Sequence, residues 1–391
     1  MAEIRVHQLH KAFADFVAVK ESNFTVRDGE FFCLLGPSGC GKTTTLRMIA
    51  GLELPTSGQI FLGNEDVSFK RASHRDIAFV FQLFALYPHM SVRQNIAFPL
   101  VSQGLPRAEI RAKVAEAARI LRIEHLVDKP VSGLSSGDRQ RVALGRAIVR
   151  QPLAFMMDEP LGALDSEFRE LMCQELRGLH DRLHATTVYV THDQLEAMAM
   201  ADTIAIMNQG VIEQLGAPQE VYDRPASVFV ADFIGSPSMN FLPFDGGYAI
   251  GADHVRIGEA VLPVPALRED ASGKALLFGV RPEHVRFAPA SALRAGPAPI
   301  SALRAEVLGT EYLGINQIVT CRTAQGATLR AKVGVELPVQ RGDSVGLAFD
   351  ASQVSLFDQA SGRALRTARH DAGRPAPRTA HVAAPLGAAH G

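Results

Sequence analysis

A short glycine-rich segment contains the residues of this sequence best suited to hold a chain of phosphates. Residues 36–43 read Gly-Pro-Ser-Gly-Cys-Gly-Lys-Thr and fit the pattern G-x-x-x-x-G-K-[ST], between an apolar run at 30–35 and a helix-forming run at 44–50. The glycines let backbone N–H groups converge on phosphate oxygens, and the helix start adds the positive end of its dipole. The predicted contact residues are Gly36, Pro37, Ser38, Gly39, Cys40, Gly41, Lys42, Thr43 and Thr44.

Two residues of this phosphate loop have separate predicted roles. Lys42 places a positive charge against the β- and γ-phosphates of a nucleotide, and the Thr43 hydroxyl is a magnesium ligand. Cys40 is interpreted as a small residue at a tolerant position rather than as a redox sensor. A glycine loop formed by chance is the alternative, and the predicted strand before it and helix after it argue against that.

Two adjacent carboxylates follow another apolar run. Residues 153–157 predict a buried strand that leads into Asp158 and Glu159. Ligands of open α/β sheets bind along the carboxyl edge of the strands, so both acids are expected near the phosphate loop. We expect Asp158 to hold magnesium through water and Glu159 to orient or deprotonate an attacking water. Two acids that merely end a strand are the alternative, and it loses weight beside a phosphate loop.

A sheet must place these residues side by side. Runs that are apolar on both faces predict buried strands, at 30–35, 76–81, 153–157 and 187–191. Such runs are typical of parallel sheets covered by helices. Residues 106–127 predict a helix with its apolar stripe at Ile110, Val114, Ala117 and Leu121. We therefore expect a three-layer α/β domain over residues 1–235, with a helical subdomain at about 88–150.

The composition changes after this domain. Short β-branched runs between Gly and Pro turns, at 275–280, 317–320 and 344–349, predict a small all-β, barrel-like domain over residues 236–358. Residues 359–391 are rich in Ala, Gly, Pro, Arg and His without an apolar period, which predicts a disordered tail.

Charge and cysteine content exclude several classes of function. The 391 residues include 40 Lys and Arg against 41 Asp and Glu, so no cationic excess supports a general affinity for nucleic acid. The longest uncharged stretch, residues 77–92, is shorter than the roughly 18 apolar residues of a membrane span. The four cysteines form no Cys-x-x-Cys pair, so we expect reduced thiols rather than disulfides or a zinc site.

A series of motifs in one order makes the sequence resemble the nucleotide-binding subunits of ATP-binding-cassette (ABC) importers, and most closely the maltose and glycerol-3-phosphate type of carbohydrate importer. Beyond the phosphate loop and Asp158-Glu159, these motifs contain Gln82, the signature-like segment Leu-Ser-Ser-Gly-Asp-Arg-Gln-Arg at 134–141, Asp165 and His192. Phe13 matches the aromatic residue that stacks on adenine, although by spacing alone it is equally an ordinary apolar residue. The resemblance covers about residues 2–357.

The resemblance implies an α/β P-loop NTPase cassette followed by an oligonucleotide-binding-like (TOBE) domain, whose recurring element resembles residues 278–285. It also implies an ATPase that uses ATP and Mg²⁺ and forms a homodimer enclosing two ATP molecules. The implied catalytic residues are Glu159, His192 and Gln82, and the implied magnesium site is Thr43, Gln82 and Asp158. Phe13, Ser135, Gly137 and Asp165 would join the phosphate loop in binding ATP.

The same resemblance implies the partners and the location. Two integral-membrane permease subunits would bind the cassette, an extracytoplasmic solute-binding protein would act indirectly, and nucleic acid would not be a partner. The chain would lie peripherally at the cytoplasmic face of the inner (plasma) membrane. Residues 83–100 would form the groove for a coupling helix of the permease, or else plain core.

The signature segment departs from the usual Leu-Ser-Gly-Gly-Gln. Ser136 and Asp138 replace a glycine and the glutamine, whereas Ser135 and Gly137 are retained, so we expect a competent site. From the residues alone, Ser135 is predicted to be the N-cap of a helix, with Asp138 completing a capping box. Such a helix start is itself an anion site.

Other functions remain as alternatives. A soluble cassette ATPase of DNA repair or translation would carry a long coiled-coil insertion or a second cassette, and this sequence has neither. A P-loop kinase or GTPase would leave the signature segment unexplained, and a guanine motif Asn-Lys-x-Asp is missing. An exporter is a further alternative, but exporters often fuse their membrane helices to the cassette, and this sequence contains no predicted membrane span. For an importer, a carbohydrate or glycerol-phosphate is the preferred solute, and polyamine, phosphonate or metal import stays open.

Overall fold

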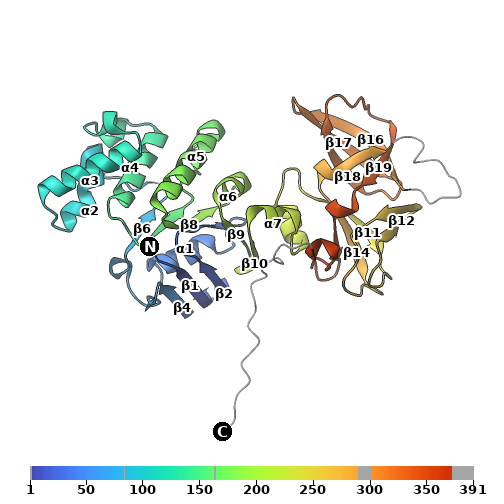
Figure 1. The fold of residues 1–391 in the computed structure, drawn as a ribbon, viewed down its shortest axis with the longest axis horizontal. Coiled ribbons are helices and arrows are strands. Elements are labelled where there is room, and N and C mark those ends of the chain that lie inside the picture. Colours follow the sequence, from blue (N-terminus) through green and yellow to red (C-terminus); the bar gives the residue numbers. More distant parts are fainter. Residues whose placement is uncertain (1, 83, 163, 289–300, 372–391) are drawn as a thin grey trace, which may run out of the picture. The chain divides into compact units, whose positions relative to one another are not determined.

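The computed structural model describes residues 2–82, 84–162, 164–288 and 301–371. Within them the chain forms two compact units, one up to Gln219 and one from Glu220 onward (Figure 1). The division precedes the predicted boundary at residue 235, because the segment before it packs with the second unit. There Ala231 shares a core cluster with Met239 and Phe357.

A six-stranded sheet forms the centre of the first unit, in the order β10-β9-β3-β8-β7-β6. Its strands are β3 (Phe31–Leu35), β6 (Ile77–Val80), β7 (Ala154–Asp158), β8 (Thr186–Thr191), β9 (Thr203–Asn208) and β10 (Val211–Gly216). All neighbours pair in parallel except β9 and β10. The four buried strands predicted from apolar runs are thus confirmed as β3, β6, β7 and β8, and every residue of β3, β7 and β8 is buried.

A second sheet in this unit was not predicted. It is antiparallel and has the order β2-β1-β4-β5, formed by β1 (Ile4–Phe13), β2 (Phe16–Val26), β4 (Ser57–Leu62) and β5 (Glu65–Asp66). Helix α1 (Lys42–Ala50) contributes Leu46 and Ile49 to one core that also includes Ile4 of this sheet and Val190 of the central sheet. The two sheets therefore hold the helix that follows the phosphate loop.

The described part of the first unit has five further α-helices: α2 (Val92–Ser102), α3 (Arg107–Ile120), α4 (Ser136–Ile148), α5 (Ser166–Leu183) and α6 (Gln194–Met200). The helix predicted at 106–127 is α3, whose stripe buries Val114 and Ala117 and leaves Ile110 half-buried. Helices α2, α3 and α4 lie together (Figure 1), within the range predicted as a helical subdomain. None of the helices described is long and apolar enough to cross a membrane.

The second unit is rich in antiparallel strands. Two short helices, α7 (Pro218–Asp223) and α8 (Val228–Phe233), stand at its start. Its sheets have the orders β11-β14-β20, β12-β13 and β15-β19-β16-β17-β18. The strands are β11 (Asn240–Asp245), β12 (His254–Ile257), β13 (Ala260–Pro263), β14 (Ala275–Val280), β15 (Val285–Ala288), β16 (Leu303–Tyr312), β17 (Asn316–Thr323), β18 (Thr328–Gly334), β19 (Ser344–Phe349) and β20 (Val354–Asp358). One hydrophobic core joins all three sheets, as the predicted all-β domain requires.

The prediction of a disordered tail from residue 359 is wrong for residues 359–371. Leu365 is only 1% exposed, and its N–H donates to Leu356 O at 2.7 Å. Arg369 donates to Asp223 O at 2.8 Å and to Val354 O at 3.0 Å. This segment packs through isolated side chains rather than a periodic stripe, so its pattern did not reveal it. The rest of the predicted tail, 372–391, lies outside the described residues.

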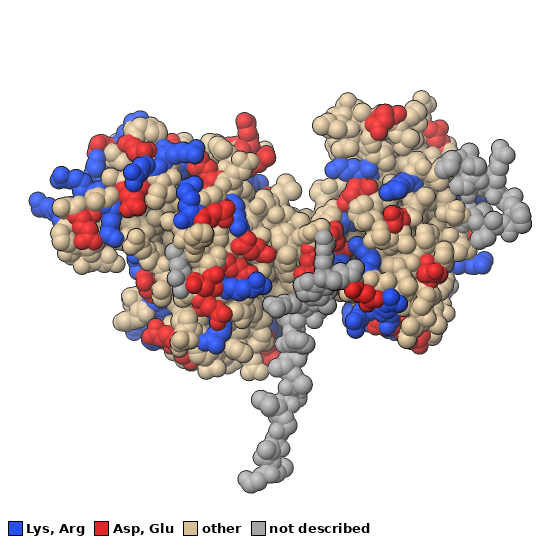
Figure 2. Space-filling model, in the orientation of Figure 1, with Lys and Arg blue, Asp and Glu red and all other residues tan. Residues whose placement is uncertain are grey.

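Charged side chains of both signs are scattered over the visible face of the chain (Figure 2). Figure 2 shows Lys and Arg interspersed with Asp and Glu on the visible face of each unit. The four cysteines, Cys33, Cys40, Cys173 and Cys321, are all free and buried.

Candidate nucleotide site

The phosphate loop connects β3 to α1 and has room only for glycine at two positions. A Cβ on Gly36 would lie 2.2 Å from Met207 O, and one on Gly41 would lie 2.5 Å from Ala18 O. Gly41 is also the N-cap of α1, with a φ of 109° that side chains rarely adopt. Pro37 is half-buried, and Ser38 and Gly39 are exposed at the top of the loop. The predicted loop therefore has the shape that exposes backbone N–H groups at a helix N-terminus.

Lys42 points into this loop. Its side chain is 4% exposed, and Nζ donates to Gly36 O at 2.8 Å and to Pro37 O at 2.9 Å. The ammonium group thus stands where the loop would surround phosphates. Cys40 Sγ lies 3.9 Å from the same Nζ, and burial raises the pKa of this thiol. A buried, protonated thiol agrees with the interpretation of Cys40 as a small space-filling residue.

Thr43 and Asp158 form a pair of oxygen ligands beside the loop. The Thr43 hydroxyl donates to Asp158 Oδ1 at 2.9 Å, across from the end of β7. Asp158 is 7% exposed, and burial raises the pKa of its carboxyl. A buried carboxylate next to a hydroxyl fits a hard cation that prefers oxygen ligands, so these residues suit Mg²⁺.

Glu159 and His192 meet at the ends of neighbouring strands. Glu159 Oε2 lies 3.1 Å from His192 Nδ1, and Glu159 N–H donates to Val190 O at 3.0 Å. The backbone of Glu159 has a φ of 44°, in the left-handed region. Gln82, exposed after β6, joins them, because its Nε2 and Glu159 Oε2 lie 3.6 and 3.9 Å from the point where a Cβ on Gly162 would stand. Glu159 and His192 are therefore in direct contact, and Gln82 lies near Glu159.

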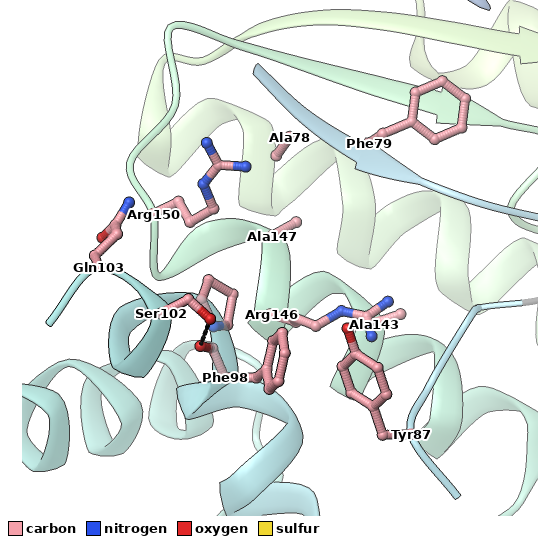
Figure 3. Close-up of a pocket in the computed structure, with 11 residues that line it drawn as sticks. Ala78, Phe79, Tyr87, Phe98, Ser102, Gln103, Ala143, Arg146, Ala147 and Arg150 are labelled. Carbon is pink, nitrogen blue, oxygen red and sulfur yellow. Dashed lines mark hydrogen bonds between the residues drawn. The ribbon is translucent and has the colours of Figure 1, made fainter. Parts of the chain in front are cut away.

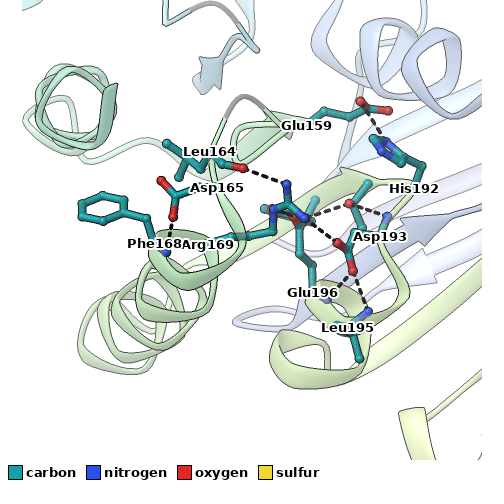
Figure 4. A network of polar contacts seen from close by, with 11 residues as sticks. Glu159, Leu164, Asp165, Phe168, Arg169, His192, Asp193, Leu195 and Glu196 are labelled. Atoms are coloured by element: carbon teal, nitrogen blue, oxygen red, sulfur yellow. Dashed lines mark hydrogen bonds and ion pairs between the residues drawn. The ribbon is translucent and has the colours of Figure 1, made fainter. Parts of the chain in front are cut away.

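A polar network behind His192 was not predicted from the sequence (Figure 4). Arg169 of α5 contacts Asp193 at 3.0 Å, Glu196 at 3.5 Å and Leu164 O at 2.8 Å. Glu196 is 3% exposed and accepts hydrogen bonds from Tyr189 and Thr191, at 2.8 and 2.7 Å, while burial raises its pKa. The available signal was Asp193 and Glu196, three residues apart at a strand-to-helix junction.

The signature segment begins α4, and its cap differs from the predicted capping box. Ser135 is the N-cap, and its Oγ accepts the Asp138 N–H at 3.1 Å as predicted. The Asp138 carboxylate does not take the Ser135 N–H; instead Oδ2 accepts the Ser135 hydroxyl at 2.7 Å. This correction arises because aspartate is one methylene shorter than the glutamate of the usual motif. Arg141 Nη1 lies 3.6 Å from Asp138 Oδ1.

The remaining predicted ATP contacts lie on other elements. Gly137 faces Phe168, whose Cε1 would stand 2.0 Å from an added Cβ. Asp165 is the N-cap of α5 and accepts the Phe168 N–H at 2.9 Å. Phe13 ends β1 with 43% of its surface exposed, and Lys11 Nζ lies 4.5 Å from its ring centre. Within one chain, the contacts of Ser135, Gly137 and Asp165 are thus with α4 and α5 rather than with the phosphate loop.

An open cavity of about 370 Å³ lies between β6, α2 and α4 (Figure 3). Its lining includes Phe79, Tyr87, Phe98 and Pro99, with Arg146 of α4 and Arg150 two residues after that helix ends. Tyr87 and Phe98 pack with ring centres 4.5 Å apart. In the described part of residues 83–100, Ile96 and Leu100 are buried in the core, while Tyr87 and Phe98 line this cavity, which is called the groove below.

Comparison with known proteins agrees with this geometry. The ABC transporter family profile matches residues 19–162, the MalK OB fold domain matches 235–285, and the TOBE domain matches 278–357. The trehalose/maltose import ATP-binding protein MalK of Thermococcus litoralis is 46% identical over 93% of this chain and 100% of its own. The sn-glycerol-3-phosphate import ATP-binding protein UgpC of Cereibacter sphaeroides is 44% identical over the same shares. Among solved structures, the dimeric bacterial ABC transporter cassette MJ0796 has a TM-score of 0.50 and 30% identity, over 55% of this chain and 98% of its own.

Proposed function

Because the chain belongs to the family of ABC importer ATP-binding subunits, we propose that the residues gathered around its phosphate loop hydrolyse ATP to energise import of a carbohydrate or glycerol-phosphate solute. The observation that carries this proposal is the convergence of Lys42, the Thr43–Asp158 pair and the Glu159–His192 pair at one sheet edge. Polyamine, phosphonate and metal import remain alternatives, because the chain does not itself contact the solute.

Each group at this edge has a task suited to its chemistry. The loop N–H groups and Lys42 bind the phosphates, and Lys42 exchanges its carbonyl partners for phosphate oxygens. Glu159 is the acceptor that orients or deprotonates water, with His192 fixing its carboxylate and Gln82 beside it. Phe13 offers an exposed ring for adenine.

Thr43 and Asp158, with Gln82, would hold Mg²⁺. Their oxygens already lie together, and Asp158 is ionisable in a buried place where a cation would offset its charge. When bound, Mg²⁺ neutralises negative charge on the phosphates.

A second copy of the chain completes the site in this proposal. Ser135 and Gly137 start a helix whose N-terminus suits an anion, yet their contacts lie away from the loop of their own chain. The dimeric form of the related cassette supports a pair of chains. In the pair proposed here, each signature segment, with Asp165, would face the nucleotide of the other chain.

The permease would dock in the groove lined by Tyr87 and Phe98. Its apolar rings and open shape suit a short helix of a membrane subunit, and the similarity to import ATP-binding proteins supports a membrane partner. Two permease subunits and a solute-binding protein outside the membrane complete the proposed assembly. Since ATP is supplied inside the cell, the chain would work at the cytoplasmic face of the plasma membrane. Genes for permeases and a solute-binding protein beside this one would identify the solute class.

The test is ATP hydrolysis by the purified chain and by Glu159→Gln. We expect the variant to bind nucleotide with wild-type affinity and to hydrolyse it at least 100-fold more slowly, because an amide cannot accept the proton. Glu109→Gln on the exposed side of α3 is the matched control and should keep the wild-type rate. Hydrolysis at the wild-type rate in Glu159→Gln would refute the assignment.

A further inference from the structure

The backbone just after Gln82 adopts a conformation that its residues do not favour. Phe84 has a φ of 61° and Ala85 a φ of 48°, so two consecutive residues with a Cβ lie in the left-handed region. Such residues persist there only when surrounding contacts hold them. Strained backbone of this kind clusters at functional and switch segments.

Arg146, in the last turn of α4, provides those contacts. Its Nη1 donates to Ala85 O at 2.7 Å, and its Nη2 donates to Phe84 O at 2.9 Å. The guanidinium carbon also lies 5.5 Å from the centre of the Tyr87 ring (Figure 3). One planar side chain therefore binds the carbonyl oxygens of both left-handed residues and contacts an aromatic ring of the groove.

The same segment is tied to Gln82 at one end and to the groove at the other. Phe84 N–H donates to Phe81 O at 2.9 Å, which anchors the segment beside Gln82. Asn95 of α2, fully buried, accepts the Tyr87 N–H at 2.9 Å and donates to Tyr87 O at 3.1 Å. Phe84 and Ala85 therefore lie on the shortest stretch of chain between Gln82 and the groove.

We propose that Arg146 is a positioning residue that makes Gln82 and the groove move together, by holding Phe84 and Ala85 in their left-handed conformation. Helix α4 begins after its N-cap Ser135, at the predicted contact with nucleotide, and carries Arg146 in its last turn, so one helix connects that contact to the residue that holds the link. The inference rests on the proposed function, because it assumes that nucleotide acts at Gln82 and Ser135.

A tryptophan in the groove would report this coupling, since the chain has none of its own. Phe98→Trp is suitable because Phe98 is 36% exposed and packs on Tyr87. We expect MgATP to shift the emission of this variant. Adding Arg146→Ala should abolish at least four-fifths of the shift while nucleotide affinity, measured with a fluorescent ATP analogue, stays within about twofold.

Arg150→Ala is the matched control. Arg150 lies one turn further along the chain, lines the same groove and contacts Ile77 O and Asp76 rather than the strained segment. It should keep the full shift. Ala85→Gly should restore part of the shift in the Arg146→Ala background, because glycine adopts a positive φ without cost. A merely structural role for Arg146 would not predict that rescue.

The outcomes separate this inference from the proposed function. The coupling is refuted if nucleotide binds and the emission of Phe98→Trp shifts equally with and without Arg146→Ala. It is also refuted if nucleotide binds and the emission of Phe98→Trp alone does not shift. If no variant binds nucleotide, the proposed function fails and the coupling with it. Should Arg146→Ala not fold, as judged by circular dichroism, Arg146→Lys decides: it keeps the charge but not the two-pronged contact, and we expect less than half of the shift. An undiminished shift there would overturn the proposal.

Discussion

Replacing Asp138 with glutamine is expected to raise the basal ATPase rate, because the Asp138 carboxylate accepts the hydrogen bond that the Ser135 hydroxyl can donate. A hydroxyl has one proton to donate, and in the structure Ser135 gives it to Asp138 Oδ2 at 2.7 Å. In the proposed dimer a γ-phosphate oxygen would need the same proton. Glutamine offers only a neutral acceptor, which binds a hydroxyl more weakly than a carboxylate does.

The size of the effect follows from the geometry. A phosphate oxygen about 2.7 Å from Ser135 Oγ would stand about 5 Å from Asp138 Oδ2. Two unit charges at that separation repel by about 3 kcal/mol at an effective dielectric constant of about 20. Arg141, 3.6 Å from Asp138, offsets about half of this. The remaining 1–1.5 kcal/mol or so corresponds to roughly a tenfold tighter closure of the dimer around ATP in Asp138→Gln.

The assay is turnover against ATP concentration, for the chain alone and in the reconstituted transporter. We expect about five- to tenfold faster turnover at low ATP in Asp138→Gln, and a smaller gain in Ser136→Gly, which restores backbone freedom near the cap. Asp128→Asn, an exposed acid paired with Arg93, is the control and should match the wild type. Unchanged or slower turnover in Asp138→Gln would show that Asp138 serves only as a helix cap.

Four further substitutions test individual groups. Lys42→Ala should weaken nucleotide binding at least 100-fold, measured by titration, because the only buried cation of the described loop disappears; near-wild-type affinity would contradict this. Glu159→Gln should accumulate as an ATP-dependent dimer by light scattering, and an unchanged mass with full turnover would count against it. Burial raises the pKa of the Asp158 carboxyl from 3.8, so its ionised form destabilises the folded chain. Asp158→Asn should therefore raise the melting temperature of the nucleotide-free chain at pH 7 but not below about pH 4. Mg²⁺ should no longer stabilise the variant, and a lower melting temperature at pH 7 would refute the reasoning. Arg169→Ala should lower the free energy of unfolding, measured with urea, by about 2–3 kcal/mol, because it leaves the buried Glu196 carboxylate without its cation. Adding Glu196→Gln should recover part of this loss. A loss below about 0.5 kcal/mol would show that the network is unimportant for stability.

The parts of the site that lie directly after buried strands could be predicted from the sequence. Apolar runs located β3, β7 and β8. Asp158 ends β7, His192 directly follows β8, and Lys42 follows β3 after the phosphate loop. Parallel strands end at one edge, so their neighbourhood in space followed from the pattern.

Contacts between distant polar residues could not be predicted in this way. Arg146 donates to carbonyl oxygens more than 60 residues earlier in the chain. Every residue has a backbone carbonyl, so the residue types at the accepting positions do not indicate such a hydrogen bond. The antiparallel sheet was missed because the pairing of β1 with β2 shifts register repeatedly, which breaks the alternation of apolar and polar residues.

The left-handed backbone of Glu159 bears on how this position can vary. A glycine or asparagine there would adopt a φ of 44° with less strain, by a margin on the order of 1 kcal/mol for glycine. Folding alone would therefore favour losing the carboxylate, and the chain accepts a less stable turn in exchange for a side chain aimed at His192. Among substitutions at this position, the most stable proteins should be among the least active, so a selection for thermal stability that ignores transport would tend to remove this glutamate.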